Sequence, residues 1–208
     1  MQFECGKFFH IYTRANTNID VLFYEDENYI FFLRKYRKYI EPIFVTLCYC
    51  LMPNHYHLLI KVKSDLELYA YQKKKNYKYA GDEIKINDFI TRQFANFHIS
   101  YSKAINKKYE RRGSLFQSKP KAKHISDINY LIRAARYIHR NPIKHKIVKD
   151  IADWSFSSFP DYANKRNGVL TDKNFLLSNY DSVEDLLRFT YNNEDDHSDE
   201  FDKFEKGE

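Results

Sequence analysis

Two strand-like runs separated by a single Pro-Asn pair constrain the fold of this chain more than any other feature. Residues 43–52 (IFVTLCYCLM) and 55–63 (HYHLLIKVK) are rich in the β-branched and aromatic side chains that favour strands. Pro53 and Asn54, which lie between the runs, are typical turn residues. The two runs therefore predict an antiparallel β-hairpin.

The rest of the chain also alternates between strand-like and helix-like segments. Apolar side chains at helical spacing mark the helices, such as Phe89 and Phe94 in the second helix. We expect Asn87 and Ser126 to cap two helices and Pro142 to end the last of them. The remaining elements are a strand at 7–13, helices at 27–40, 87–110 and 127–141, and a basic extended stretch at 111–123.

The order of these elements indicates the fold class. Strands and helices follow one another as β-α-β-β-α-β-α, which is typical of an α+β domain. We therefore expect a ferredoxin-like antiparallel sheet with helices packed on one face. Residues 1–180 would form this single domain, with a polar loop or irregular insertion at 65–86. The acidic end of the chain, 181–208, predicts a short helix at 182–191 and a disordered tail.

The composition excludes several classes of protein. Only five Gly and five Pro, with 17% aromatic residues, exclude collagen-like and mostly disordered chains. No apolar run approaches the roughly 18–20 residues that span a bilayer, and the N-terminus lacks the pattern of a signal peptide. Three cysteines cannot form a disulfide framework, and their odd number fits a reducing cytoplasm.

The charge of the chain is divided into two unlike parts. The whole sequence has 34 Lys and Arg against 28 Asp and Glu, which gives a formal net charge of +6. Residues 181–208 hold 11 acidic and three basic side chains, a net charge of −8, which leaves +14 on residues 1–180. A cationic body is typical of proteins that bind polyanions such as nucleic acid, although solvated surface lysines produce the same excess.

His55 and His57 begin the second run of the hairpin. Side chains two apart on a strand point to the same face, so both imidazoles can reach one metal ion. Two histidines on a strand also occur without any metal. Cys48 and Cys50 raise the alternative of a Cys/His zinc site, if Cys50 faces His55 and Cys48 faces His57. Structural zinc sites usually have other spacings, and buried cysteines in strands are more often small apolar side chains.

Tyr137 and Asn141 lie one turn apart on the helix predicted at 127–141. Residues four apart share a helix face, so the phenol and the amide point the same way. The stripe that includes Leu131, Ala135 and Ile138 would be buried, which leaves Tyr137 at its border. Each of the two is also typical of a structural role, as a packing tyrosine and as the end of a helix.

Four segments taken together resemble a known family. They are YCLMPNHYHLLIKV (49–62), RRGSLFQSKPK (111–121), YIHRNPIKHKIV (137–148) and DWSFSSFPDY (153–162). In this order they are similar to the REP-associated tyrosine transposases, the single-tyrosine branch of the HUH (His-hydrophobic-His) nucleases. The resemblance covers roughly residues 7–162. Tyr56 is an aromatic residue at the hydrophobic position of the His-hydrophobic-His motif.

The resemblance implies a role for each of four residues. His55 and His57 would be metal ligands, Asn141 would complete the metal site, and Tyr137 would be the nucleophile. The metal would be Mg²⁺ or Mn²⁺: two imidazoles and an amide favour Mn²⁺ by their softness, whereas cellular abundance favours Mg²⁺. Attack by the tyrosine would give a 5′-phosphotyrosine and a free 3′-OH, which preserves the energy of the bond for rejoining.

The DNA contacts would lie along the basic stretch at 111–123. Its cations can follow a phosphate backbone, and Phe116 can stack on unpaired bases unless it is a core residue like Leu115. Trp154, Phe156 and Phe159 would form a packing cluster that fixes the nucleophile helix. The predicted cationic contacts are Arg111, Arg112, Lys119, Lys121 and Lys123.

The resemblance thus implies a metal-dependent endonuclease and transposase, either of a mobile element or a domesticated descendant of one. It would act on single-stranded, hairpin-bearing DNA in the bacterial cytoplasm, at the nucleoid. One alternative is a non-catalytic hairpin DNA- or RNA-binding module on the same fold; another is a zinc-stabilised structural protein. Single-tyrosine relatives include dimers and monomers, so a homodimer stays open. The Lys-rich insertion at 72–78 has no predicted role. We hypothesise that the acidic tail competes with DNA for the basic surface.

Overall fold

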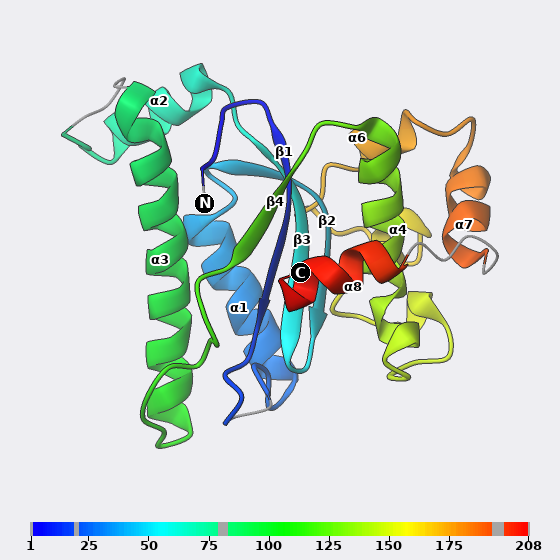
Figure 1. Cartoon of the computed structure of the whole chain (residues 1–208), viewed down its shortest axis with the longest axis horizontal. Coiled ribbons are helices and arrows are strands. Elements are labelled where there is room, and N and C mark those ends of the chain that lie inside the picture. The colour runs from blue at the N-terminus through cyan, green and yellow to red at the C-terminus, as the bar shows by residue number, and fades with distance from the viewer. Residues whose placement is uncertain (1, 19–20, 79–82, 193–197, 208) are drawn as a thin grey trace.

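Four antiparallel strands form one sheet in the order β2-β3-β1-β4 (Figure 1). The computed structural model describes residues 2–18, 21–78, 83–192 and 198–207. The strand order and the predicted hairpin are those of a ferredoxin-like fold, so the expected fold class is confirmed. In chain order the elements of this fold are β1 (Phe8–Arg14), α1 (Asp26–Tyr39), β2 (Phe44–Met52), β3 (His55–Val62), α2 (Asp65–Lys74), α3 (Glu83–Lys108), β4 (Lys121–Ile125) and α4 (Ile128–Lys144).

Helices cover both faces of the sheet. As expected, the two helices α1 and α3 lie on one face, where Phe32 of α1 packs on Phe97 of α3 and on Tyr56 of β3, with ring centroids 4.7 and 5.0 Å apart. The opposite face is covered by α4, whose Leu131 and Ile138 belong to a second core cluster with residues of β2 and β3. Because both faces are covered, nearly every residue of the hairpin is buried.

Four local predictions differ from the structure. Asn87 does not cap a helix: it lies inside α3, which begins at Glu83, and its Oδ1 accepts from the Phe3 N–H at 2.8 Å. Residues 65–74 form α2 rather than a loop, because Ser64 and Glu67 make a reciprocal capping box. The N-cap of α4 is Asp127, not Ser126: its carboxylate accepts from the Tyr130 N–H at 2.7 Å. Pro142 does not end α4, which continues to Lys144. A proline removes a single hydrogen bond, and so close to the end of a helix that loss is tolerated.

The chain after α4 wraps around this helix. Its elements are a short 3₁₀ helix (Ile151–Asp153), α5 (Phe159–Tyr162), α6 (Lys173–Leu177), α7 (Val183–Tyr191) and α8 (Ser198–Lys206). Helix α7 matches the predicted helix at 182–191. Helix α8 was not predicted, because its acidic composition favoured disorder. The predicted disorder at 193–197 falls outside the described residues.

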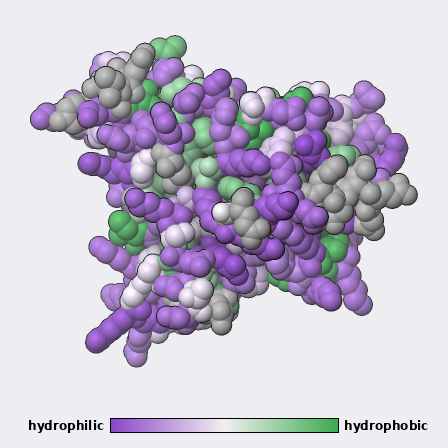
Figure 2. All heavy atoms as spheres, viewed as in Figure 1, coloured by the Kyte–Doolittle hydropathy of each residue, from purple (hydrophilic) through white to green (hydrophobic). Residues whose placement is uncertain are grey.

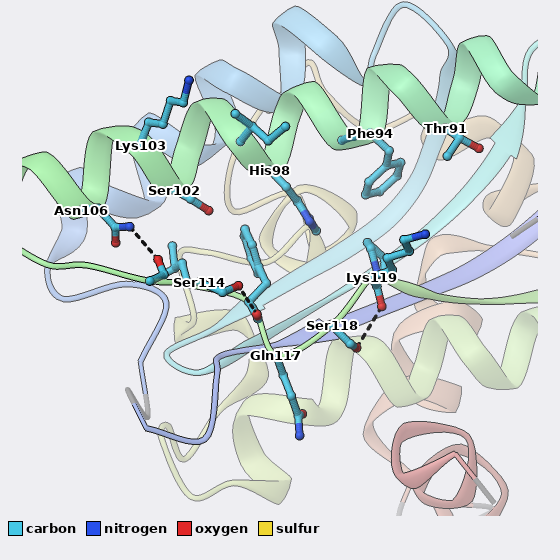
Figure 3. A pocket seen from close by; sticks show the side chains of 16 residues that line it. Thr91, Phe94, His98, Ser102, Lys103, Asn106, Ser114, Gln117, Ser118 and Lys119 are labelled. Carbon is cyan, nitrogen blue, oxygen red and sulfur yellow. Dashed lines mark hydrogen bonds between the residues drawn. The ribbon is translucent and has the colours of Figure 1, made fainter.

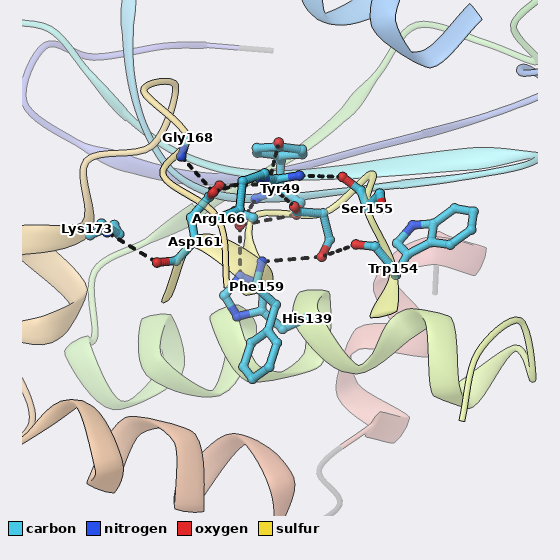
Figure 4. Close-up of polar contacts among 11 residues, drawn as sticks. Tyr49, His139, Trp154, Ser155, Phe159, Asp161, Arg166, Gly168 and Lys173 are labelled. Carbon is cyan, nitrogen blue, oxygen red and sulfur yellow. Dashed lines mark hydrogen bonds and ion pairs between the residues drawn. The ribbon is translucent and has the colours of Figure 1, made fainter. Parts of the chain in front are cut away.

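A polar network connects the segment 154–168 to the sheet and to α4 (Figure 4). The buried Asp161 carboxylate accepts from Arg166 Nε and Nη2, both at 2.7 Å, and from the Gly168 N–H at 2.9 Å. Ser158 Oγ lies 2.8 Å from His139 Nε2 of α4 and accepts from the Tyr49 N–H of β2 at 2.9 Å. These bonds hold α4 against the sheet.

The predicted aromatic cluster is divided between the two faces of the sheet. Phe159 packs on His139 of α4, with ring centroids 5.3 Å apart, as expected. Trp154 and Phe156 instead contact Tyr29 of α1, on which Phe156 stacks at 3.9 Å. The prediction that all three fix α4 was wrong, because the segment between residues 154 and 159 crosses from one layer to the other.

The surface in Figure 2 is mainly hydrophilic, with hydrophobic side chains scattered over it. Among the described residues, no helix is long and apolar enough to cross a membrane.

Candidate active site

Four predicted site residues meet between β3 and α4. His55 and His57 project from β3 toward the helix, and their ring centroids lie 5.1 Å apart. His55 Nε2 is 3.0 Å from Asn141 Oδ1 on α4. One turn earlier on the same helix, the ring of Tyr137 lies 5.7 Å from that of His57. All four side chains are buried.

Burial determines the charge of the two imidazoles. It lowers the pKa of His55 to about 4, although the bond to Asn141 opposes this shift. Burial also lowers the pKa of His57 well below its ordinary value, and the neighbouring histidines His55 and His10 add to the shift. Both rings are therefore neutral at pH 7, which is the form that binds metal ions.

Two buried polar atoms at the centre of this cluster lack hydrogen bonds within the described parts of the chain. They are Nε2 of His57 and Nδ2 of Asn141. Such unpaired buried atoms are uncommon and fit a position at which an ion or ligand binds, although Glu205 Oε1 lies 3.3 Å from Nε2 of His57. Neighbouring ligands on an octahedral divalent cation, each about 2.1 Å from the metal, lie about 3 Å apart. The 3.0 Å between His55 Nε2 and Asn141 Oδ1 fits this arrangement.

Helix α8 lies beside α4 (Figure 1) and packs on Tyr137 of that helix. Phe201 stacks on the Tyr137 ring at 4.7 Å, and the Tyr137 hydroxyl donates to the carboxylates of Asp202, at 3.0 Å, and Glu205. Burial first, and then the Glu205 carboxylate, raise the pKa of Tyr137 far above its ordinary value. With α8 in this position the tyrosine is a protonated phenol that solvent barely reaches.

The acidic side chains of α8 also meet cations of the body. Lys144 of α4 pairs with Asp202, and Lys123 of β4 pairs with Glu200 at 3.2 Å. Lys121 donates to the Glu205 carbonyl at 2.5 Å. Helix α8, in the acidic end of the chain, thus lies against Lys121 and Lys123 of the predicted DNA contacts.

Three further side chains belong to the cluster and were not singled out in the sequence. His10 of β1 is fully buried, and its Nε2 lies 3.0 Å from Nδ1 of His57. Tyr12, also of β1, packs on His57 at 5.0 Å between ring centroids. Asn54 Oδ1 lies 2.6 Å from His55 Nδ1. Only the pairing of β1 with β3, which sequence spacing does not reveal, brings His10 and Tyr12 to the histidines.

The predicted DNA contacts have different environments. Arg112 and Lys119 are exposed, and Arg111 is half-buried, with Nη1 3.4 Å from Asn106 Oδ1. Phe116 is a core residue that stacks on His98 at 3.9 Å, so one of its faces is already occupied.

A cavity of about 510 Å³ lies beside Phe116, between α3 and residues 113–120 (Figure 3). Phe94 and His98 of α3 point toward residues 115–119 in this view. Lys103 and Lys119 also line the cavity, so it combines aromatic walls with cationic residues.

The geometry does not support the zinc alternative. Cys50 lies opposite His57, and Cys48 lies opposite Leu59, so the predicted facing pairs were wrong. The two-residue turn, in which Met52 pairs with His55, sets this register. Within the described ranges, no three or more His, Cys, Asp or Glu side chains form a group that could hold a metal ion. Both thiols are buried apolar groups.

Comparisons with known proteins agree with the motif resemblance. No family model matches the chain. A Haemophilus influenzae protein named as a REP-associated tyrosine transposase is 28% identical over 116 residues. The match spans 56% of this chain and 59% of that protein, which is less than two thirds of its length.

A solved structure of a REP-associated tyrosine transposase bound to a REP hairpin has the same fold. It superposes with a TM-score of 0.51 at 17% sequence identity, and the match covers 83% of this chain and 91% of that chain. The resemblance first indicated by the four motifs is therefore confirmed in sequence and in fold: this chain is similar to the REP-associated tyrosine transposases.

Proposed function

We propose that this protein is a metal-dependent transposase and endonuclease that cleaves and rejoins single-stranded, hairpin-bearing DNA through Tyr137. The observation that carries the proposal is the meeting of His55, His57, Asn141 and Tyr137 in one buried cluster. The relative in the solved structure is bound to a REP hairpin, which supports a hairpin substrate for this chain.

His55, His57 and Asn141 would hold the divalent cation, Mn²⁺ or Mg²⁺. The unpaired Nε2 of His57 and the 3.0 Å separation between His55 Nε2 and Asn141 Oδ1 both fit such an ion. When bound, the cation supplies positive charge that polarises the scissile phosphate. Two imidazoles in the ligand set favour Mn²⁺, because Mg²⁺ prefers oxygen ligands.

Tyr137 would attack the scissile phosphorus through its phenol oxygen. The new bond joins this oxygen to the 5′ phosphate, while the bond from phosphorus to the 3′ oxygen breaks; the phenol loses its proton, and the 3′ oxygen takes up one proton in the net reaction. The products are a 5′-phosphotyrosine and a free 3′-OH. Attack by another 3′-OH reverses the step and rejoins DNA without ATP. The Lys144 ammonium, 4.9 Å from the centre of the Tyr137 ring, favours the anionic phenolate that attacks.

The basic surface around residues 111–123 would bind the DNA. Lys119 lines the cavity beside Phe116, in which an unpaired base can be held, and Arg111 and Arg112 directly precede Gly113, which also lines it. Lys121 and Lys123 lie nearer the tyrosine, where α8 now contacts them. Substrate would therefore displace α8 in order to reach Tyr137. Action on DNA is consistent with a place in the cytoplasm, at the nucleoid.

A gel assay tests the proposal. Labelled single-stranded hairpin DNA is incubated with Mn²⁺ and the Glu205→Ala protein, in which α8 is loosened, and is then run on a denaturing protein gel. We expect a covalent adduct that disappears in the additional Tyr137→Phe variant. Tyr130→Phe is the matched control, because Tyr130 lies on the same helix and also packs on Phe201. Tight binding of DNA or RNA without any adduct would instead favour the non-catalytic binding module.

A further inference from the structure

A pair of buried histidines links β1 to the candidate metal site. His10 and His57 are both inaccessible to solvent, and Nε2 of His10 lies 3.0 Å from Nδ1 of His57. The antiparallel register places Tyr12 opposite His57, so His10 lies two residues along β1 on the same face. The proposed function gives His10 no role.

The hydrogen bond between the two rings limits where their protons lie. Nε2 of His10 and Nδ1 of His57 are within hydrogen-bond distance, so one of these nitrogens carries the shared proton and the other accepts it. A neutral imidazole carries one N–H, and its other nitrogen offers a lone pair. If His57 donates Nδ1–H to His10 Nε2, the lone pair of His57 lies on Nε2. This atom lacks a hydrogen bond among the described residues, and so does Nδ1 of His10, which would then carry the proton of that ring.

His55 has a matching arrangement. Its Nδ1 lies 2.6 Å from Asn54 Oδ1 in the hairpin turn, and its Nε2 faces Asn141 Oδ1. An amide oxygen only accepts, and a neutral imidazole has one N–H, so His55 can donate to Asn54 or to Asn141 but not to both; the shorter distance, 2.6 Å against 3.0 Å, favours the proton on Nδ1. The Nε2 lone pair of His55 is then directed toward Asn141. Both histidines would thus have an outer partner on Nδ1 and a free lone pair on Nε2.

We propose that His10 is a positioning residue for the metal site: its Nε2 accepts the Nδ1–H of His57 and so keeps the Nε2 lone pair of His57 available to a divalent cation. Asn54 does the same for His55. Outer-shell partners of this kind fix the tautomer and orientation of metal-binding histidines. This inference rests on the metal-dependent function proposed above.

A carboxylate of helix α8 favours the other tautomer of His57. Glu205 Oε1 lies 3.3 Å from His57 Nε2, and a carboxylate there attracts a proton onto that nitrogen. The hydrogen bond between the two rings is compatible with either tautomer of His57, because Nε2 of His10 can accept from or donate to His57. The tautomer is therefore best measured in Glu205→Ala protein, in which this carboxylate is removed.

Two measurements test the role of His10. The first is the ¹⁵N NMR spectrum of the histidine rings in metal-free Glu205→Ala protein at pH 7. We expect His57 to carry its proton on Nδ1, and a proton on Nε2 overturns the proposal. The second is Mn²⁺ affinity, followed by the electron paramagnetic resonance signal of the free ion. We expect His10→Phe to weaken binding by about 10- to 100-fold, the size usual for an outer-shell partner.

His10→Gln and His139→Phe are the controls. Glutamine offers an acceptor oxygen near the position of Nε2, so we expect Mn²⁺ affinity within a few-fold of the parent. His139 is also a buried histidine, but it contacts Ser158 in the network that holds α4 rather than the cluster, so its loss should weaken Mn²⁺ binding less than the loss of His10 does. Equal affinity in His10→Phe and the parent overturns the proposal and leaves the proposed function intact. Absence of Mn²⁺ binding in the parent overturns the metal site itself, and the positioning role with it.

Discussion

Asn141 connects α4, the helix that carries Tyr137, to the first histidine. Its Oδ1 lies 3.0 Å from His55 Nε2, and its Nδ2 is buried without a hydrogen bond among the described residues. We predict that Asn141→Ala lowers Mn²⁺ affinity by on the order of 10-fold or more, since even outer-shell partners have effects of this size. Asn141→Asp should retain Mn²⁺ and gain Mg²⁺ affinity, because a carboxylate is the harder ligand. Calorimetric titration of both ions checks this, and unchanged Mn²⁺ affinity in the alanine variant removes Asn141 from the site.

Asp161 has a structural role, outside the candidate active site. It is 2% exposed and pairs with Arg166, whose side chain is 36% exposed. We predict that Asp161→Ala lowers the free energy of unfolding by about 2 kcal/mol, at the lower end for a broken buried pair because the arginine remains partly solvated.

Lys165→Ala is the matched control for Asp161→Ala. Lys165 pairs with Asp150 at 3.8 Å, with both side chains about half exposed, and such pairs contribute little to stability. Urea unfolding of the two variants measures the difference. Equal stability losses would contradict a special role for the Asp161 network.

At the scale of elements, the N-cap of α4 stabilises the first turn of the helix that carries Tyr137. Asp127 accepts from the Tyr130 N–H at 2.7 Å, while the neighbouring Ser126 is exposed. Asp127→Ala should therefore lower the free energy of unfolding by about 1 kcal/mol, and Ser126→Ala should have almost no effect. Thermal melting of the two variants distinguishes them; a larger loss in Ser126→Ala would place the cap where the sequence first suggested.

Much of the fold follows from local sequence patterns. The hairpin, α1, α3 and α4 are visible in the sequence because each has a strong period and a clear boundary such as Pro53. Helix α2 is not, because it buries only Leu68 and Gln72 and therefore has little periodicity. The cap at Asp127 was missed because Ser126 is an equally good cap in sequence terms.

The site was predictable only in part. His55, His57, Tyr137 and Asn141 come from motifs that are each continuous in sequence. His10 and Glu205 reach the same cluster from 45 and more residues away, through strand pairing and through the docking of α8. The spacing of residues within one element contains no information about contacts of this range.

At the scale of the whole molecule, the buried histidines predict how stability depends on pH. Burial lowers the pKa of His98 and His139 to about 3, as it does for His10. In the unfolded chain these groups titrate near pH 6.5, so between pH 6.5 and 3 the unfolded state binds more protons than the folded state. Stability should therefore rise with pH in this window and fall on acidification.

We expect the protein to lose at least about 2 kcal/mol of unfolding free energy between pH 7 and pH 5, the contribution of a single such histidine. Urea denaturation at the two pH values measures this. Equal stability at both pH values would mean that the buried histidines are protonated in the folded state. The rings of the candidate metal site would then not be in the neutral form that binds a metal ion.

The position of α8 shows where acidic side chains from the end of the chain meet the basic residues of 1–180. Asp202 and Glu205 lie against Lys144, His57 and the Tyr137 hydroxyl, where a substrate phosphate would lie. We predict that the double variant Asp202→Ala/Glu205→Ala binds hairpin DNA about tenfold more tightly, because salt-dependent phosphate contacts replace contacts with α8. A titration by fluorescence anisotropy at fixed salt measures the affinity.

Asp181→Ala/Glu184→Ala is the control for this charge change. It removes the same two negative charges from exposed positions at the start of α7, and salt screens those at a distance. An equal gain in both double variants would mean that net charge, rather than the position of α8, limits binding. A cut after Tyr180 is a poorer test, because α7 contributes the buried Leu186 to the core.

The central claim is that Tyr137 becomes covalently linked to DNA. The most direct measurement is mass spectrometry of peptides from Glu205→Ala protein that has reacted with hairpin DNA and Mn²⁺, after digestion with nuclease and protease. The proposed function predicts a 5′-phosphonucleotide on the peptide that contains Tyr137, and none in metal-free reactions. A nucleotide on any other residue, or cleaved DNA with no linked peptide, would contradict it.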